Sequence, residues 1–333
     1  MILAGDIGGT KSLLSLFSAQ GGPRAAQNER SLPSRDYPTL AEVLKDYLRG
    51  TREKVDVTCL GIPGPVVEGR SETPNIPWVV DAREIERVVG GRVILLNDLE
   101  ASGYGVATLR PEEFETLSKG QPNPQGNAAI IAPGTGLGEV VLFWDGRMHV
   151  PSASEGGHAD FAPRDHQEME LLDYLLKEFD RVSFDRVVTG GGLRRVYNFL
   201  RDRGRESEPG WLADELARAE DPSAVISRVA LEKRDPTCEK ALDLWVALLG
   251  AEAGNLALKA LATAGVYLGG GIAPKILAKL RDATFLTNFH NKGRLSTVVG
   301  RMPVRVILEA RVGLYGAARF ALLEAESPRR APA

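Results

Sequence analysis

Short apolar runs alternate with polar turns and with helical stretches along most of the chain. The runs are as long as strands, and residues that favour turns, such as glycine, asparagine and aspartate, follow them. The predicted strands cover residues 2–5, 12–17, 55–60, 92–96, 128–132, 139–143, 265–268 and 304–308. Strands that alternate with helices are typical of an α/β fold.

Apolar residues spaced three and four positions apart predict helices between these strands. The predicted helices cover residues 39–48, 82–89, 98–108 and 312–323, and residues 166–262 are mostly helical, with the longest helix running from Cys238 towards Ala262. Asp81, followed three residues later by Glu84, resembles the capping box that opens a helix. Pro274 favours another helix start, because proline is tolerated in a first helical turn.

The length of 333 residues favours about two domains. Residues 119–127 form a polar loop that favours a domain boundary. The strand–turn–strand unit that follows this loop echoes the one at residues 2–17, which is a weak internal duplication.

Composition excludes several classes of protein. A net charge of −3, with 43% hydrophobic and 26% charged residues, gives no sign of a nucleic-acid or membrane partner. The apolar runs are too short to span a bilayer, and the N-terminus lacks a basic signal region. Cys59 and Cys238 form no paired motif, so we expect free, buried thiols in a reducing cytoplasm. The four histidines show no zinc-ligand spacing with cysteine.

Three glycine-rich turns, at residues 5–10, 134–138 and 269–271, directly follow predicted strands. Glycine lets backbone N–H groups converge on an anion, which is what a triphosphate requires. Tight hairpins use the same residues, so one such turn alone is ambiguous, whereas three favour phosphate binding. The predicted phosphate-binding residues are Gly8, Gly9, Thr10, Lys11, Gly134, Thr135, Gly136, Gly269, Gly270 and Gly271. Lys11 is equally typical of an exposed hairpin lysine.

Two common nucleotide motifs do not fit these turns. The Walker pattern fails because Thr10 stands where its second glycine is required. The segment at 134–138 has the wrong spacing for a dinucleotide-binding loop, and a strand follows it instead of a helix. The phosphates are therefore expected on β-hairpin turns, which is the actin-like arrangement.

Acidic residues adjoin two of the predicted strands. Asp6 beside a triphosphate requires a cation, and Mg²⁺ held through water is the expected one, although a local turn would also use an aspartate. Asn97 and Asp98 end a strand at a sheet edge, where a carboxylate base could activate a hydroxyl that attacks a γ-phosphate. The alternative for Asp98 is a helix N-cap.

Glu155 and His158 flank two glycines, so the backbone can aim both side chains at one place. Polyol recognition needs several donors and acceptors together, because an unpartnered buried hydroxyl costs about 1–3 kcal/mol. An ordinary surface histidine is the alternative for His158.

These motifs together resemble those of bacterial glucokinases of the hexokinase-like group. The matching segments are G-D-I-G-G-T at 5–10, G-I-P-G-P at 61–65, T-P-N-I-P-W at 73–78, L-N-D-L-E-A at 96–101, A-P-G-T-G-L-G at 132–138, E-G-G-H-A-D-F-A-P at 155–163, R-V-V-T-G-G-G-L at 186–193 and G-V-Y-L-G-G-G-I-A-P at 265–274. They span nearly the whole chain in one order, so the match is more specific than any single turn.

The resemblance implies a two-domain actin-like ATPase (ribonuclease H-like) α/β fold, with a cleft between a small and a large domain. The small domain would comprise residues 1–108 and 309–328 and the large domain residues 109–308, followed by a disordered tail at 329–333. It implies a cytoplasmic, homodimeric enzyme that uses ATP and Mg²⁺ to phosphorylate the 6-hydroxyl of D-glucose, the first step of glycolysis.

The resemblance also assigns roles to residues. Asp98 would be the catalytic base, and the sugar would be bound by Asn75, Asn97, Asp98, Glu155, His158 and Asp185. The family usually has glutamate at position 185, and the shorter aspartate puts a direct sugar contact in doubt. The cysteine-rich zinc motif of the related repressor–kinase family is absent from the sequence, which indicates the zinc-free group.

Three alternative functions are compatible with parts of the sequence. A sugar-responsive repressor would carry a helix-turn-helix before the first glycine-rich turn, which here begins at residue 5. A kinase for mannose, fructose or an N-acetylhexosamine would differ mainly in its pocket residues. If the chain were a non-catalytic actin-like module, the Asn97–Asp98 and Glu155–His158 motifs would be present by coincidence. The phosphoryl donor also stays open, since ADP or polyphosphate could replace ATP.

Overall fold

The computed structural model describes residues 1–73, 76–204 and 208–326, and the chain divides into two compact units. Unit 1 contains residues 1–113, 147–153 and the C-terminal part from Glu309, and unit 2 contains residues 114–146 and 154–308. Asn75 and the expected tail at 329–333 lie outside the described residues.

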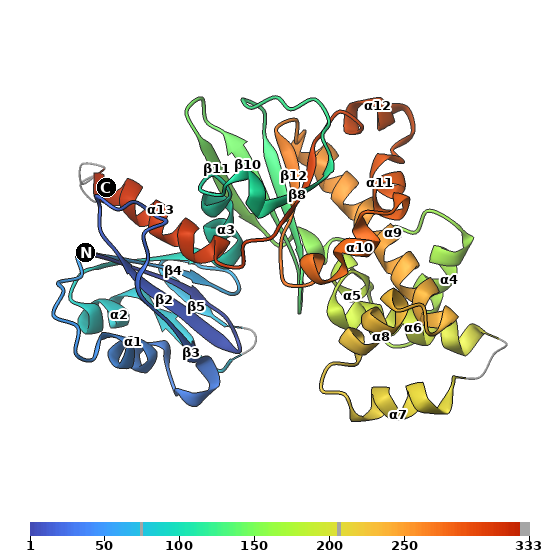
Figure 1. Ribbon diagram of the computed structural model, residues 1–333, viewed down its shortest axis with the longest axis horizontal. Helices are drawn as coiled ribbons and strands as arrows, with labels where there is room; N and C mark the ends of the chain where they lie inside the picture. The colour runs from blue at the N-terminus through green and yellow to red at the C-terminus, as the bar shows by residue number, and fades with distance from the viewer. Residues whose placement is uncertain (74–75, 205–207, 327–333) are drawn as a thin grey trace. The chain divides into compact units, whose positions relative to one another are not determined.

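Unit 1 is built on a five-stranded sheet with the order β3-β2-β1-β4-β7 (Figure 1). Its strands are β1 (Ile2–Ile7), β2 (Lys11–Phe17), β3 (Gln27–Pro33), β4 (Val57–Ile62) and β7 (Arg92–Asn97). β1, β4 and β7 run parallel, and β2 returns antiparallel to β1. The predicted opening hairpin is confirmed, but Asp6 and Ile7 belong to β1, not to the turn, because Asp6 pairs with Leu13 and Ile7 with Ser12.

Helices cover both faces of this sheet, as Figure 1 shows. α1 (Leu40–Leu48) and α2 (Ala82–Val89) pack on one face, and α3 (Asp98–Val106) and α13 (Val312–Glu326) on the other. Asp81 is the N-cap of α2, as predicted, and accepts a hydrogen bond from Arg83 N. The remaining elements of this unit are β5 (Arg70–Glu72), β6 (Val79–Asp81), β11 (His149–Ser154) and single 3₁₀ turns at Ser34–Asp36 and Pro111–Glu113.

α3 and α13 approach each other closely because small residues face each other. A Cβ built on Gly105 would lie 2.0 Å from the Val312 carbonyl oxygen, and one on Gly316 would lie 1.6 Å from that of Ala101. The glycines therefore fix how close α13 lies to α3.

Unit 2 contains strands in the order β10-β9-β12-β13-β8. They are β8 (Phe114–Ser118), β9 (Ala128–Pro133), β10 (Leu137–Trp144), β12 (Gly265–Leu268) and β13 (Val304–Ile307). β9 and β10 form the second predicted hairpin, and β12 lies parallel to both β9 and β13.

The rest of unit 2 is helical. Its α-helices are α4 (His166–Leu175), α5 (Phe184–Val187), α6 (Gly190–Arg203), α7 (Gly210–Arg218), α8 (Pro222–Leu231), α9 (Pro236–Ala260), α10 (Leu277–Leu280), α11 (Ala283–His290) and α12 (Ser296–Val299). Single 3₁₀ segments lie at Gly156–His158, Ala273–Ile276 and Gly293–Leu295. Pro274 therefore stands in a 3₁₀ segment, not in an α-helix as predicted.

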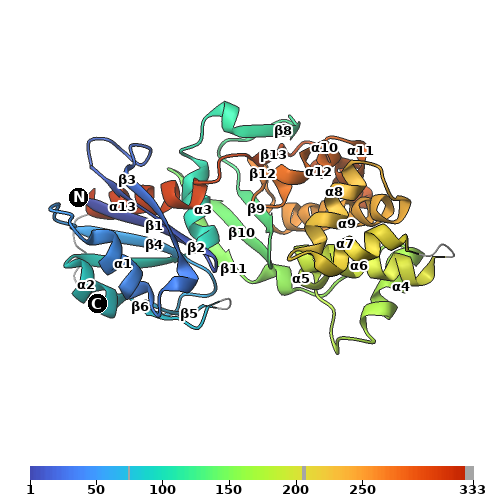
Figure 2. The ribbon, with the colours of Figure 1, turned by 60° about the horizontal axis from the view of Figure 1, so that its bottom comes forward.

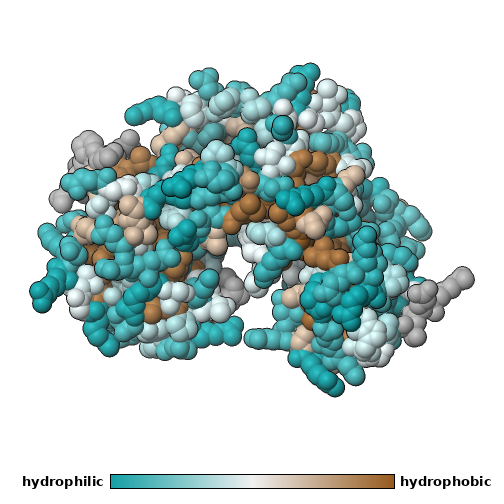
Figure 3. All heavy atoms as spheres, viewed as in Figure 1, coloured by the Kyte–Doolittle hydropathy of each residue, from teal (hydrophilic) through white to brown (hydrophobic). Residues whose placement is uncertain are grey.

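α9 is the central helix of unit 2, and α6, α8 and α11 pack around it (Figure 2). By length and composition alone, α9 would pass as a membrane-crossing helix, although Asp243 and Glu252 interrupt its apolar runs. Its position explains the apolar content, because 78% of its most apolar window is buried inside the protein. The face drawn in Figure 3 is mainly hydrophilic, with apolar residues in smaller groups.

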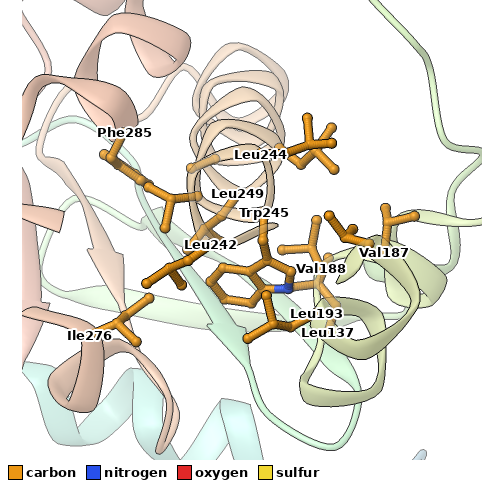
Figure 4. Packing of buried hydrophobic residues seen from close by; sticks show 14 of the residues in the cluster. Leu137, Val187, Val188, Leu193, Leu242, Leu244, Trp245, Leu249, Ile276 and Phe285 are labelled. Carbon is orange, nitrogen blue, oxygen red and sulfur yellow. The ribbon is translucent and has the colours of Figure 1, made fainter. Parts of the chain in front are cut away.

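The core around Trp245 of α9 reaches the second hairpin. Figure 4 shows the Trp245 indole among Leu137, Val188 and Leu193. Leu137 begins β10, Val188 directly follows α5, and Leu193 lies in α6. The indole Nε1 donates to the Thr189 carbonyl oxygen at 3.0 Å. The start of β10 therefore rests on the buried core of unit 2.

Candidate active site

In unit 1, the carboxyl ends of β1, β4 and β7 meet at one edge of the sheet. Asp6 pairs with Gly61, and Ile62 pairs with Asn97. This register brings Asp6 and the Asn97–Asp98 pair to the same edge, and the position of Asn97–Asp98 at a sheet edge is as predicted. Gly61 allows α3 to lie close to β4, because a Cβ at this position would lie 3.0 Å from Ala101 Cβ and 3.5 Å from Asp98 Cα.

Asn97, and not Asp98, is the N-cap of α3. Its Oδ1 accepts from Leu99 N at 3.0 Å, its Nδ2 donates to the Gly64 carbonyl oxygen at 3.0 Å, and its own N–H donates to Glu100 at 3.1 Å. Asp98 is the first residue of the helix, and its Oδ1 also accepts from Leu99 N at 2.9 Å. The N-cap alternative for Asp98 is therefore wrong, since its neighbour fills that position.

Asp6 is a half-buried carboxylate close to a second one. Burial raises the pKa of Asp6 to about 6, the negative charge of Asp98 adds to this shift, and Lys11 opposes it. α13 also approaches Asp6, because a Cβ built on Gly313 would lie 3.0 Å from Asp6 Cγ. Two neighbouring carboxylates of this kind suit a bound cation, which would offset their repulsion.

The first glycine-rich turn is closed by its own backbone and supported by a serine. Gly8 N donates to the Lys11 carbonyl oxygen at 2.9 Å. Ser34, which is fully buried, donates through Oγ to the Gly8 carbonyl oxygen at 2.7 Å and through N to that of Thr10 at 3.0 Å. Because the Gly8 amide is used inside the turn, the amides after it are the candidates for phosphate binding.

In unit 2, the second and third glycine-rich turns lie side by side. Gly270 has a φ of +75°, and a Cβ there would lie 2.6 Å from the Pro133 carbonyl oxygen, so glycine is required. Gly134 N donates to the Gly136 carbonyl oxygen at 2.8 Å, and Gly190 N donates to that of Gly134 at 3.0 Å. The predicted phosphate-binding residues at 134–136 and 269–271 are thus brought together.

The Glu155–His158 segment forms a 3₁₀ turn on top of the second hairpin. A Cβ built on Gly157 would lie 1.9 Å from the Leu137 carbonyl oxygen, which shows how tightly this turn packs on β10. His158 Nε2 and Glu155 Oε2 are 4.0 Å apart, and both side chains are exposed. The two side chains are therefore near enough to contact one small polar ligand.

Asp185 lies against the same hairpin. Its Oδ1 accepts from Leu137 N at 2.7 Å and would lie 3.1 Å from a Cβ built on Gly136. Thr189 Oγ1 donates to the Asp185 carbonyl oxygen at 3.0 Å. In this structure the Asp185 carboxylate holds the start of β10.

The structure groups the predicted site residues by unit. Unit 1 holds Asp6, Gly8, Gly9, Thr10, Lys11, Asn97 and Asp98, and unit 2 holds Gly134, Thr135, Gly136, Glu155, His158, Asp185, Gly269, Gly270 and Gly271. The sequence analysis missed Ser34 and Gly313, since one lies in a polar segment and the other in an ordinary helix. Among the described residues, no cluster of three or more His, Cys, Asp or Glu side chains could hold a metal by itself.

Comparison with known proteins identifies the family of this chain. The sequence profile of the family described as Glucokinase matches residues 3–324. The chain belongs to the glucokinase family. A glucokinase of Nostoc punctiforme is 40% identical over 334 residues, which cover 96% of this chain and 98% of that protein.

Solved structures agree with the family assignment. The crystal structure of a glucokinase from an Antarctic psychrotroph matches with a TM-score of 0.82 at 27% identity, covering 96% of this chain and 98% of that chain. A ROK family glucokinase from Streptomyces griseus, solved in complex with glucose and AMPPNP, matches with a TM-score of 0.65 at 21% identity, covering 96% and 98%. At 21% identity, the similarity to the Streptomyces griseus structure shows the fold only. It is the actin-like ATPase fold of these sugar kinases.

Proposed function

We propose that this enzyme of the glucokinase family transfers the γ-phosphoryl group of ATP to the 6-hydroxyl of D-glucose with Asp98 as the general base. The observation that carries the proposal is the position of Asp98 at the sheet edge near Asp6, while Asn97 caps the helix. Because Asn97 provides the cap, capping does not account for a carboxylate at position 98.

In the proposed step, the 6-hydroxyl oxygen attacks the γ-phosphorus as the bond from phosphorus to the leaving ADP breaks. The hydroxyl is a poor nucleophile, and its proton passes to a carboxylate oxygen of Asp98. Asp98 also orients the attacking oxygen in line with the leaving group, which adds to the effect of the proton transfer.

The phosphates are proposed to bind at the glycine-rich turns. The first turn, which Gly8 closes, would contribute Gly9, Thr10 and Lys11, and the paired turns of unit 2 would contribute Gly134, Thr135, Gly136, Gly269, Gly270 and Gly271. Support comes from the tight backbone geometry of Gly8, Gly134 and Gly270, which leaves adjacent amides able to converge on an anion.

Mg²⁺ fits the donor set of unit 1. Asp6 supplies a hard oxygen ligand, and its pKa is raised mainly by burial and further by the nearby charge of Asp98, which a cation would offset. Asp6 would hold the ion through water. The ion would neutralise charge on the β- and γ-phosphates during transfer.

The sugar is proposed to contact Asn75, Asn97, Asp98, Glu155, His158 and Asp185. Support comes from the turn that places Glu155 and His158 4.0 Å apart and from the sheet edge that holds Asn97 beside Asp98. Asn75 lies outside the described residues, and its role rests on the family resemblance alone.

We also propose that the enzyme acts in glycolysis in the cytoplasm, as a homodimer, without a nucleic-acid or membrane partner. Both described cysteines, Cys59 and Cys238, are free and buried, which suits a reducing compartment. The dimer is proposed from the family resemblance.

A coupled assay over a panel of hexoses, N-acetylhexosamines and phosphoryl donors tests the proposal. We expect glucose with ATP and Mg²⁺ to give the highest kcat/KM of the panel. A higher value for another sugar, or for ADP or polyphosphate as donor, would replace that part of the proposal.

A further inference from the structure

Two glutamates of unit 2 are buried, and one of them contacts the Glu155–His158 turn. Glu139 of β10 is 2% exposed, and Glu252 of α9 is fully buried. The two side chains are near enough for the charge of Glu252 to act on Glu139. Two ionised carboxylates at this distance would repel strongly in a buried setting, so one of them must keep a proton.

The hydrogen bonds identify which glutamate keeps the proton. Glu252 accepts from Asn255 Nδ2 at 2.8 Å and from Lys259 Nζ at 3.3 Å, so its negative charge is compensated. Glu139 Oε1 is buried and has no hydrogen-bond partner among the described residues. A protonated Glu139 that donates to Glu252 satisfies both groups, because a carboxyl O–H needs an acceptor.

Glu139 also supports the turn directly. A Cβ built on Gly156 would lie 2.4 Å from Glu139 Oε2, so the turn rests directly on this carboxyl group at a glycine. If Glu139 ionised, its carboxylate would need water or a donor, and Gly156 of the turn packs directly against its Oε2. Ionisation should therefore displace the turn.

We infer that Glu139 is a positioning residue: it shares a proton with Glu252, holds the Glu155–His158 turn in place, and weakens glucose binding when that proton is lost. The inference rests on the proposed function, since it takes this turn as part of the sugar site. It goes beyond that function by assigning a role to a buried pair that takes no part in phosphoryl transfer.

The charges around the pair agree with this assignment. Burial and the charge of Glu252 raise the pKa of Glu139 to about 8, and Lys259 opposes the shift. Lys292 donates to Asn255 Oδ1 at 2.6 Å, and its own pKa is lowered to about 8 by burial and by Arg164. Glu155 and His158 on the turn are exposed, and the paired strand β9 carries no titratable side chain.

Calorimetric titration of glucose from about pH 6.5 to about pH 9.5 tests the inference. In the wild-type enzyme, the affinity should fall by about tenfold or more across the upper half of this range. Glu139→Gln keeps the shape and a donor for Glu252, so this variant should bind glucose normally at neutral pH and keep that affinity at alkaline pH. Glu220→Gln, at an exposed position of the same unit, should behave as the wild type.

Lys292 titrates in the same range, and Glu139→Gln separates the two groups. If the variant loses affinity with the same pH profile as the wild type, Lys292 or another group is responsible and the inference is wrong. A flat profile in the wild type would also overturn it. If neither protein binds glucose at any pH, the proposed function has failed, which is a different outcome.

A measurement on the wild-type protein covers the case in which the variant does not fold. Carbon-13 NMR of labelled glutamate carboxyl groups should show one carboxyl that titrates several units above the ordinary value of about 4.3. If all glutamates titrate near the ordinary value, the shared proton does not exist.

Discussion

His158 is the residue whose removal most directly tests the sugar site. His158→Ala should weaken glucose binding by about 1–3 kcal/mol and leave ATP binding nearly unchanged, because a sugar hydroxyl would lose its partner. Calorimetry with each ligand measures both effects. His166→Ala, which also removes an exposed histidine of unit 2, should change neither affinity. An unchanged glucose affinity in His158→Ala would remove the residue from the site.

Asp185 and Glu155 should differ in their importance for the sugar. Asp185 already accepts the Leu137 amide at 2.7 Å, and its shorter side chain would reach the sugar through a bridging water. Asp185→Ala should therefore cost less glucose affinity than Glu155→Ala. Equal losses for the two variants, measured by the same titration, would show that Asp185 contacts the sugar directly.

Site residues could be predicted from the sequence where a glycine or an acidic residue directly follows an apolar strand. The glycines at 134–136 and 269–271 and the acids Asp6 and Asp98 stand directly after apolar strands, so their location at strand ends followed from the pattern. Ser34 and the Glu139–Glu252 pair were not predicted. Their roles depend on contacts between residues far apart in the chain, and no local spacing reveals such contacts.

At the scale of elements, the first glycine-rich turn depends on the 3₁₀ turn that carries Ser34. Ser34→Ala removes the bonds to the partly buried Gly8 carbonyl oxygen and to the fully buried Ser12 Oγ. We expect the free energy of unfolding to fall by about 1–3 kcal/mol and the KM for ATP to rise. Denaturant unfolding and initial-rate kinetics measure these changes.

Ser31→Ala is the matched control, because Ser31 is exposed on β3 in the same segment. It should leave stability and kinetics unchanged. If Ser34→Ala lowers stability but not the affinity for ATP, the first turn does not bind the phosphates.

The elements that the sequence predicted are those with a buried face. α1, β4, β9 and β12 carry continuous or periodic apolar residues, and their predicted bounds lie within about two residues of the observed ones. β3 was missed because only one of its residues is buried, so it has no apolar alternation. The short helices α11 and α12 were missed because each is too brief to show a clear period.

At the scale of the whole molecule, the proposed function uses residues from both units. Asn97 and Asp98 belong to unit 1, and Glu155 and His158 belong to unit 2. Glucose should therefore slow amide hydrogen exchange near the start of α3 and also in the segment 154–160. Mass spectrometry of exchange with and without glucose measures this. Protection confined to one unit would contradict a sugar site drawn from both.

The order of the motifs along the sequence identified the family. The sequence did not reveal how the chain divides into two units. Residues 147–153 belong to unit 1 although they lie between two segments of unit 2, and no change of composition marks them. The length and apolar content of α9 likewise give no sign, by themselves, that it is a buried core helix.

The central claim is that Asp98 is the catalytic base, and the turnover of Asp98→Asn tests it most directly. Asparagine keeps the shape and the hydrogen bond to Leu99 N, and Asn97 still caps α3, so the fold and glucose binding should persist. Asp36→Asn, an exposed change in the same unit, should keep full activity. The account predicts that kcat of Asp98→Asn falls by about 10²–10⁴ or more. Retention of more than about a tenth of the wild-type kcat, in a folded variant that binds glucose, would contradict it.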